Sequence, residues 1–271
     1  MRIDGTVAFV TGAGSGIGRQ TALALARRGA DVALADVRPD RLEPVAHEIK
    51  ALGRGATCHT VDVADSDAFW RVRDEVVEAH GRCNIVVNNA GVTSAGAFGS
   101  ESLEDLRWIV GINLWGVVHG CRAFLEVLDE HRPAHIVNLS SMVGLLGLPH
   151  NASYSLTKGA VRSFSEALRA ELAPAGIGVT TVFPGAIRTD ITNRARGSSA
   201  IKLKEMGGSR FAPLVMRRPE AVASAIVKGV ERNRGRVVVG PDARVVAGLT
   251  RLVPGRSGPL GRLTAALERR G

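Results

Sequence analysis

The chain has little cysteine and few aromatic residues, and each shortage excludes a class of protein. Its three cysteines, Cys58, Cys83 and Cys121, are far apart in the 271 residues. Their spacing matches neither a metal-binding motif nor the disulfide framework of a small secreted protein. We therefore expect no metal site and a cytoplasmic protein. Aromatic residues make up only 4%, so the core must consist mainly of Ala, Val, Leu and Ile, which suits a parallel sheet between helices.

Long apolar runs and basic clusters are also missing. No apolar stretch reaches the about 20 residues of a membrane span, and the first residues lead into a strand without the apolar region of a signal peptide. We therefore expect a soluble protein. The net charge of +9 raises the question of nucleic-acid binding. Because acidic residues are interleaved with the scattered arginines, we expect a basic surface and no nucleic-acid site.

Short apolar runs alternate with helical patterns along most of the chain. Strands are predicted at 7–10, 32–35, 56–61, 85–87, 136–139, 179–183 and 237–239, and helices at 17–28, 42–52, 66–79, 103–128 and 152–172. This alternation predicts an α/β fold with a doubly wound parallel sheet, the Rossmann fold. No linker or repeat interrupts the pattern, so we expect a single domain over residues 1–271.

Two segments depart from this regular pattern. Between residues 189 and 219 the sequence lapses into Gly, Ser, Arg and Lys, and we expect a mobile cover over the site there. Residues 241–271 form a C-terminal extension with an apolar helical stripe and nearby arginines. The stripe consists of Val245, Val246, Leu249, Leu252 and Val253, and then Leu260, Leu263 and Leu267. Such a stretch can lie on an anionic membrane, but we favour packing on its own domain or on another subunit.

A glycine-rich turn, Thr11 to Gly18, lies between the first strand and the first helix. Its glycines let backbone N–H groups approach a diphosphate, and the helix N-terminus adds partial positive charge. Asp36 closes the second strand, where it can accept hydrogen bonds from both adenosine ribose hydroxyls. It would repel the 2′-phosphate of NADP by roughly 4 kcal/mol, an effect that Arg19 and Arg38 would partly offset. The pattern predicts NAD as the cofactor.

Tyr154 and Lys158 share one face of the long helix at 152–172. Tyrosine has a reference pKa near 10, and a value of about 7 requires roughly 4 kcal/mol of phenolate stabilisation. An ammonium about 4 Å away supplies an amount of that order. The spacing therefore predicts that Lys158 lowers the pKa of Tyr154 and makes it a general acid/base. Taken alone, the same spacing also fits an ordinary amphipathic helix.

Taken together, these motifs resemble the short-chain dehydrogenase/reductase family over about residues 5 to 240. The matching elements are Thr11-Gly12-x-x-x-Gly16-Ile17-Gly18, Asn88-Asn89-Ala90-Gly91, Asn113, Ser141, Tyr154-x-x-x-Lys158 and Pro184-Gly185. Their order and spacing together are specific. The resemblance implies that Tyr154 exchanges the proton and Ser141 holds the substrate oxygen. It also implies that Lys158 grips the nicotinamide ribose and that Asn113 supports a water relay.

The resemblance further implies a set of cofactor contacts. They are Gly12, Ser15, Gly16, Ile17, Gly18, Asp36, Asp62, Val63, Asn89, Ala90, Gly91, Tyr154, Lys158, Pro184, Gly185, Ile187 and Thr189. NADP preference in the family is often marked by a basic residue at the position of Ser15 or Val37, and both are uncharged here. The resemblance also implies a homo-oligomer, a dimer or tetramer formed through helices at about 115–130 and 152–172.

We therefore expect an NAD-dependent oxidoreductase that interconverts an apolar secondary alcohol and a ketone. Apolar residues after Ser141 are expected to line the substrate pocket, namely Met142, Val143, Leu145, Leu146 and Leu148. One alternative is an NADP-dependent carbonyl reductase, against which Asp36 argues. Another is a non-catalytic dinucleotide sensor, against which the complete set of catalytic residues argues.

Several further residues receive a structural interpretation. We expect Ser140 to be structural, His150 to be a solvated loop residue rather than a substrate contact, and Cys121 to serve packing. Trp108 and Trp115 share a helix face, and we expect them to make core or subunit contacts rather than to bind substrate.

Overall fold

Parallel strands form one sheet in the order β3-β2-β1-β4-β5-β6-β7 in the computed structural model, which describes residues 1–189, 191, 195–201 and 216–252. The strands are β1 (Val7–Thr11), β2 (Asp31–Asp36), β3 (Ala56–Thr60), β4 (Ile85–Asn88), β5 (His135–Leu139), β6 (Gly178–Pro184) and β7 (Arg236–Val239). The chain runs outward from β1 to β3 and then returns to place β4 on the other side of β1. This reversal opens a crevice at the carboxyl ends of β1 and β4, and it confirms the predicted doubly wound fold.

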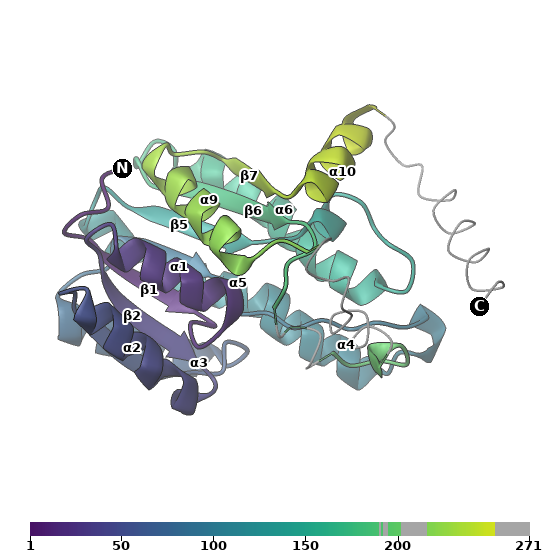
Figure 1. Ribbon diagram of the computed structural model, residues 1–271, viewed down its shortest axis with the longest axis horizontal. Coiled ribbons are helices and arrows are strands. Elements are labelled where there is room, and N and C mark those ends of the chain that lie inside the picture. Colours follow the sequence, from purple (N-terminus) through teal and green to yellow (C-terminus); the bar gives the residue numbers. More distant parts are fainter. Residues whose placement is uncertain (190, 192–194, 202–215, 253–271) are drawn as a thin grey trace.

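Helices cover both faces of the sheet (Figure 1). On one face lie α1 (Gly16–Ala26), α2 (Leu42–Ala51) and α9 (Pro219–Glu231), and on the other lie α3 (Ser66–His80), α5 (Gly116–Glu130) and α6 (Ala152–Leu172). Each face has its own hydrophobic cluster. Successive strand residues alternate between them, since Ala8 and Val10 belong to the first cluster and Phe9 to the second.

The predicted elements agree with the structure to within two residues at each end, but α9 was not predicted. Its buried residues include Val222, Ile226 and Val230, whose spacing of four is the helical signal that the sequence analysis overlooked. α9 packs against α1, so its apolar face completes the cluster on that side of the sheet.

The predicted helical region after residue 103 consists of α4 (Leu103–Val110), a π-helical turn (Gly111–Trp115) and α5. By length and composition alone, Leu103–Glu130 could cross a membrane, which the sequence analysis did not anticipate. However, 44% of its most apolar stretch is buried inside the fold, where α5 packs against α3 and β4. This packing is typical of a core helix.

The C-terminal extension begins with α10 (Pro241–Leu252). Ala243 is fully buried, whereas the stripe residues Val245, Leu249 and Leu252 are exposed. Val246, also of the stripe, is half-buried, so the described part of the stripe packs only partly on its own chain; packing on another subunit stays a prediction. Residues 253–271, which contain Leu260, Leu263 and Leu267, lie outside the described residues.

Candidate active site

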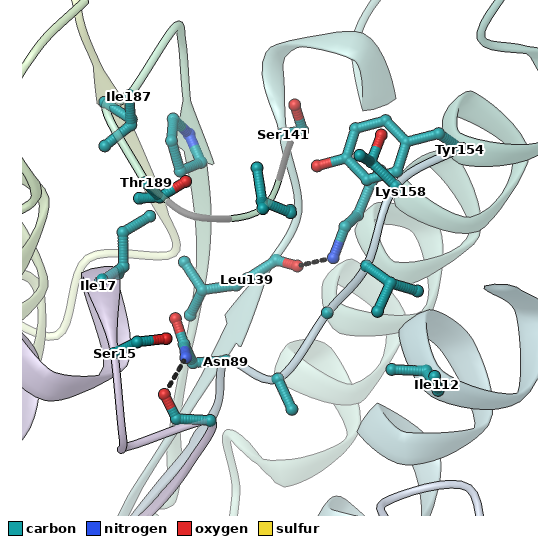
Figure 2. Close-up of a pocket in the computed structure, with 18 of the residues that line it drawn as sticks. Ser15, Ile17, Asn89, Ile112, Leu139, Ser141, Tyr154, Lys158, Ile187 and Thr189 are labelled. Carbon is teal, nitrogen blue, oxygen red and sulfur yellow. Dashed lines mark hydrogen bonds between the residues drawn. The ribbon is translucent and has the colours of Figure 1, made fainter. Parts of the chain in front are cut away.

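A cavity of about 620 Å³ lies at the carboxyl ends of β1, β2, β4, β5 and β6 (Figure 2). This volume falls within the range of about 300–1,000 Å³ typical of ligand and cofactor sites. Most predicted site residues line it: Gly12, Ser15, Gly16, Ile17, Asp36, Asp62, Val63, Asn89, Ala90, Gly91, Ser141, Tyr154, Lys158, Pro184, Gly185, Ile187 and Thr189. Gly18 and Asn113 are the two predicted site residues that do not line it.

The glycine-rich turn has the backbone geometry that its sequence predicts. Gly12 and Gly16 have φ angles of 64° and 52°, in the left-handed region that favours glycine. A Cβ at Gly18 would lie 2.1 Å from the Gly12 carbonyl oxygen, so Gly18 allows α1 to approach the turn closely, and its contact with a cofactor stays a prediction. The first turn of α1 has no side-chain cap and no acidic residue, which leaves its N–H groups available to an anion.

Thr11 joins the ends of β1 and β4. Its Oγ1 accepts hydrogen bonds from the N–H groups of Asn89 and Ala90, both at 3.0 Å. The Asn89 side chain donates in return to the Thr11 carbonyl oxygen at 2.8 Å. These bonds place residues 89–91 beside the glycine-rich turn. Thr11 belongs to the recognised motif, but the predicted site residues did not include it.

Asp36 is 9% exposed at the end of β2. Its Oδ2 accepts the Gly14 N–H at 3.1 Å, and its Oδ1 accepts the Arg38 N–H at 3.1 Å. Each carboxylate oxygen can accept more than one hydrogen bond, so Asp36 keeps acceptor capacity toward the cavity that it lines. The two backbone bonds fix the orientation of the carboxylate.

The two arginines expected to offset the charge of Asp36 each pair with another carboxylate, although the charge of Asp36 still contributes to raising the pKa of Arg38 after the larger effect of Asp40. Arg19 pairs with Glu48 at 2.5 Å, and Arg38 pairs with Asp40 at 2.9 Å. Neither arginine lines the cavity, whereas Arg41 does. Arg41, which the sequence analysis missed, is therefore the cation at this end of the cavity among the described residues.

The other end of the cavity holds Ser141, Tyr154 and Lys158, opposite Ser15 and Ile17 in Figure 2. Lys158 is 4% exposed, and its Nζ donates a hydrogen bond to the Leu139 carbonyl oxygen at 3.0 Å. Burial lowers the pKa of Lys158 to about 8, because removal from water disfavours the ammonium. The Ser140 hydroxyl donates to the Lys158 carbonyl oxygen at 2.7 Å, which ties α6 to the end of β5 and agrees with a structural role, and Ser140 also lines the cavity.

Tyr154, the single tyrosine of the chain, does not have the lowered pKa that the sequence analysis expected. Burial raises the pKa of Tyr154 above its ordinary value, and a hydrogen bond with Ser141 only partly opposes this effect. The Lys158 Nζ lies 5.8 Å from the centre of the Tyr154 ring and is directed to Leu139. The expectation was wrong for this arrangement because desolvation of the phenol outweighs the effects that favour the phenolate.

Asn113 lies in the π-helical turn and is fully buried. Its Oδ1 accepts the Val92 N–H at 2.8 Å, and its Nδ2 donates to the Val92 carbonyl oxygen at 2.9 Å and to the Thr157 Oγ1 at 3.3 Å. The amide therefore fixes the segment after β4 against α6. A role of Asn113 in a water relay stays a prediction.

The substrate end of the cavity is only partly as expected. Met142 and Val143 line it, but Leu145, Leu146 and Leu148 do not, because the 3₁₀ turn Met142–Gly144 changes the direction of the chain. Additional lining residues that the sequence analysis did not assign to the site include Val92, Thr93, Ile112, Asn151, Ile191 and Met216. Most of these residues are apolar.

Trp108 also lines the cavity, so the expectation of a core or subunit contact was wrong for this residue. Its spacing of four from Ile112, another lining residue, was the available signal. Trp115 instead stacks on His119 and is 53% exposed.

His150 is exposed and does not line the cavity. Cys121 is buried, and burial raises the pKa of its thiol to about 12, in agreement with packing.

The described residues of the predicted cover contact the site at two places. Ile187 forms a β-bridge with Arg217, and Ser94 forms one with Arg196. The Arg196 guanidinium lies 4.2 Å from the centre of the Trp108 ring and 3.2 Å from the Asp105 carboxylate. Thr189, Ile191 and Met216 line the cavity, whereas residues 190, 192–194 and 202–215 lie outside the described residues. The mobility of the cover stays a prediction.

No cluster of three or more His, Cys, Asp or Glu side chains suited to a metal ion occurs within the part of the chain that the structure describes. The polar groups that line the cavity are instead hydroxyls, backbone and side-chain amides, the carboxylates of Asp36 and Asp62, the Arg41 guanidinium and the Lys158 ammonium. These groups suit hydrogen bonding to a polar ligand and proton transfer.

Comparison with known proteins identifies proteins that are similar to this chain. The chain is 40% identical over 256 residues to EphD of Mycobacterium tuberculosis, which is named as an oxidoreductase; the match covers 92% of this chain and 43% of that protein. The chain thus spans less than half the length of EphD. A short-chain dehydrogenase/reductase from Burkholderia phymatum in complex with NAD has a TM-score of 0.84 and 29% identity, covering 93% of this chain and 95% of the other.

An alcohol dehydrogenase from Thermococcus sibiricus complexed with 5-hydroxy-NADP is also similar, with a TM-score of 0.75 and 27% identity over 86% of this chain and 95% of the other. The family model described as short chain dehydrogenase matches residues 6–199. This match includes the glycine-rich turn, Ser141, Tyr154 and Lys158. With the fold and the cavity arranged as above, the chain belongs to the short-chain dehydrogenase family.

Proposed function

We propose that this protein is an NAD-dependent oxidoreductase that interconverts an apolar secondary alcohol and a ketone, with Tyr154 as the acid/base. One observation carries the proposal: a single cavity has Asp36 at one end and Ser141, Tyr154 and Lys158 at the other. The first end suits an adenosine ribose, and the second suits a reacting oxygen. The B. phymatum structure in complex with NAD supports a dinucleotide in such a cavity.

The residues present fit a nicotinamide dinucleotide. The uncapped start of α1 and the left-handed glycines Gly12 and Gly16 suit the diphosphate. After the end of β6, two hydrogen bonds form the β-bridge between Ile187 and Arg217. The Arg217 N–H donates to the Ala186 carbonyl oxygen, and the Arg188 N–H donates to the Arg217 carbonyl oxygen. Because backbone groups alternate in direction along an extended segment, the N–H and C=O of Ile187 face the opposite side. This pair of a donor and an acceptor suits the carboxamide of a nicotinamide.

When bound, a nicotinamide dinucleotide supplies the hydride acceptor for an alcohol or the hydride donor for a ketone. The Ser141 hydroxyl donates a hydrogen bond to the substrate oxygen and holds it near the Tyr154 hydroxyl. In the oxidative direction, the Tyr154 phenolate takes the proton from the alcohol hydroxyl as the carbonyl forms. In the reductive direction, the Tyr154 phenol returns that proton to the oxygen. In this structure the Lys158 ammonium is directed to Leu139, and we propose that it stabilises the phenolate once the dinucleotide is bound.

Asp36 is the main support for NAD over NADP. Its fixed carboxylate faces the position of the adenosine ribose, and a phosphate there would be repelled. Arg41, which lines the same end of the cavity, would moderate this repulsion. We therefore propose a preference for NAD rather than exclusion of NADP. NADP-dependent carbonyl reduction is the alternative within the same reaction class.

The assembly and the location also belong to the proposal. Trp115 and Leu156, on the helices through which the family associates, are 53% and 55% exposed, which supports a homo-oligomer. A cytoplasmic location and a small-molecule substrate without nucleic-acid or membrane partners complete the proposal. Sedimentation of the purified protein as a monomer at micromolar concentration would contradict the assembly.

The deciding experiment is the change in nicotinamide absorbance with a panel of apolar secondary alcohols and ketones, with NAD and with NADP, for the wild type and for Tyr154→Phe. We expect turnover with NAD that falls by about 10²–10⁴-fold in Tyr154→Phe. Turnover that survives the substitution would refute the role of Tyr154. Binding of NADH without turnover of any substrate would favour the non-catalytic sensor.

A further inference from the structure

Asp242 lies in the first turn of α10 and outside residues 6–199, which the family model matches. β7 ends at Val239, and Gly240, with a φ of 111°, leads the chain into α10. This turn directs Asp242 to the segment that follows β6. There its Oδ2 accepts a hydrogen bond from the Ala186 N–H at 2.6 Å.

The fit around the Asp242 carboxylate is close on two sides. A Cβ at Gly185 would lie 2.2 Å from both carboxylate oxygens, and one at Gly240 would lie 2.3 Å from Oδ1. Real Cβ contacts are never so short, so both positions need glycine for the carboxylate to occupy this place. The carboxylate therefore fills a space that is shaped by two separate turns.

This contact determines how the segment after β6 faces the cavity. The Ala186 N–H is bound to Asp242, and the Ala186 carbonyl oxygen accepts the Arg217 N–H at 2.9 Å. These two bonds hold the peptide units on both sides of Ala186, the Gly185–Ala186 unit and the Ala186–Ile187 unit, so neither can rotate freely. Ile187 follows immediately and lines the cavity, and its own N–H and C=O face away from Arg217.

We propose that Asp242 is a positioning residue for the dinucleotide: it holds the 185–187 segment so that Ile187 presents its N–H and C=O to the carboxamide. The inference rests on the proposed function. Asp242 does not itself contact the reacting atoms. It acts through Ala186 and gives the start of the C-terminal extension a role in cofactor binding.

Two ligands distinguish this role from a general structural one. NADH contains the carboxamide, whereas ADP-ribose has the same adenosine, diphosphate and second ribose without the nicotinamide. We expect Asp242→Ala to weaken NADH binding about tenfold and to leave ADP-ribose binding unchanged, as measured by calorimetry. Asp242→Asn should bind NADH like the wild type, because its amide oxygen can still accept the Ala186 N–H.

The control is Val245→Ala on the same helix, a position that is 61% exposed, and it should leave both affinities unchanged. If Asp242→Ala does not fold, Asp242→Ser tests the loss of the same hydrogen bond, because the serine side chain is too short to reach the Ala186 N–H. An equal loss for both ligands, or no loss for NADH, would refute the positioning role. Equal affinity of the wild type for NADH and for ADP-ribose would also refute the positioning role. Failure of the wild type to bind either ligand would instead refute the proposed function.

Discussion

The Nζ of Lys158 lies 3.0 Å from the carbonyl oxygen of Leu139 and donates a hydrogen bond to it. Leu139 is the last residue of β5, so the end of the sheet holds the ammonium in place beside Tyr154. This arrangement buries a positive charge whose hydrogen bond goes to a neutral carbonyl rather than to a carboxylate. Burial accordingly lowers the pKa of Lys158 from 10.5 to about 8.

The first prediction concerns stability. Below pH 8, Lys158 is charged in both the folded and the unfolded state, and burial of the charge destabilises the fold. Lys158→Met should therefore increase the free energy of unfolding of the ligand-free protein at neutral pH, by at most about 3 kcal/mol. Urea denaturation of both proteins measures this difference. Turnover should be lost in the same variant.

The pH dependence supplies the control. As the pH rises from about 8 to 10.5, the folded protein releases the Lys158 proton before the unfolded chain does. The stability of the wild type should then rise toward that of Lys158→Met, and the difference should vanish above this window. A variant less stable than the wild type at neutral pH would show that the bond to Leu139 outweighs the desolvation of the ammonium.

The second prediction concerns Tyr154. Because the chain has one tyrosine, the ultraviolet absorbance of tyrosinate reports this residue alone. We expect the ligand-free protein to titrate above the ordinary value of 10.0, since burial raises the pKa. Tyr154→Phe provides the baseline. Titration below 10.0 without ligand would mean that Lys158 already controls the phenol, as the sequence analysis expected.

The third prediction concerns cofactor choice. Asp36→Asn removes the negative charge but keeps an oxygen that can accept one of the two backbone N–H groups now bound. The ratio of NADPH to NADH affinity should rise by about a hundredfold. This change corresponds to part of the repulsion of roughly 4 kcal/mol between the Asp36 carboxylate and the 2′-phosphate. Arg38→Gln, at an arginine paired with Asp40, is the matched control and should change the ratio little. An unchanged ratio in Asp36→Asn would remove the support for NAD preference.

The fourth prediction concerns the substrate wall. Trp108 lines the cavity, and Arg196 packs over its ring. Trp108→Ala should raise KM for bulky apolar alcohols about tenfold while it changes kcat little, because it removes apolar contact area away from the reacting oxygen. Trp70→Ala, outside the cavity, is the control. Equal effects on small and bulky alcohols would argue against a role of Trp108 in selectivity.

The fifth prediction concerns acid sensitivity. His135 is buried, and burial is the main reason why its pKa falls from 6.5 to about 3. Thr180 donates its hydroxyl proton to the Arg234 carbonyl oxygen, so His135 must donate its Nε2 proton to Thr180 across 2.7 Å. A lowered pKa in the fold means that stability is complete above pH 6.5 and is lost as the pH falls toward 3.

Free energies of unfolding across this pH window test the effect. We expect a loss of up to about 1.4 kcal/mol per pH unit in the wild type and a shallower slope in His135→Gln. His47→Gln, at an exposed histidine of α2, is the control and should keep the slope of the wild type. If the free energy of unfolding of His135→Gln falls with pH as steeply as that of the wild type, the acid sensitivity belongs to other groups.

The sequence by itself determined the fold and most of the cofactor-side and catalytic residues that line the cavity. Apolar periodicity gave the strands and most helices, because burial on a sheet imposes it locally. The glycine-rich turn, Asp36, Ser141 and the Tyr154–Lys158 pair line one cavity because the carboxyl ends of parallel strands share one edge. α9 was not predicted, although the spacing of four between Val222, Ile226 and Val230 indicates a helix.

The tertiary structure alone decided the partners and the protonation of these residues. Lys158 bonds Leu139, Ala186 bonds Asp242, and Arg196 covers Trp108, and all three pairs join residues far apart in the chain. Periodicity describes only neighbours along one element, so it cannot predict such contacts. The raised pKa of Tyr154 likewise follows from burial, a property of the whole packed fold rather than of the spacing between a tyrosine and a lysine.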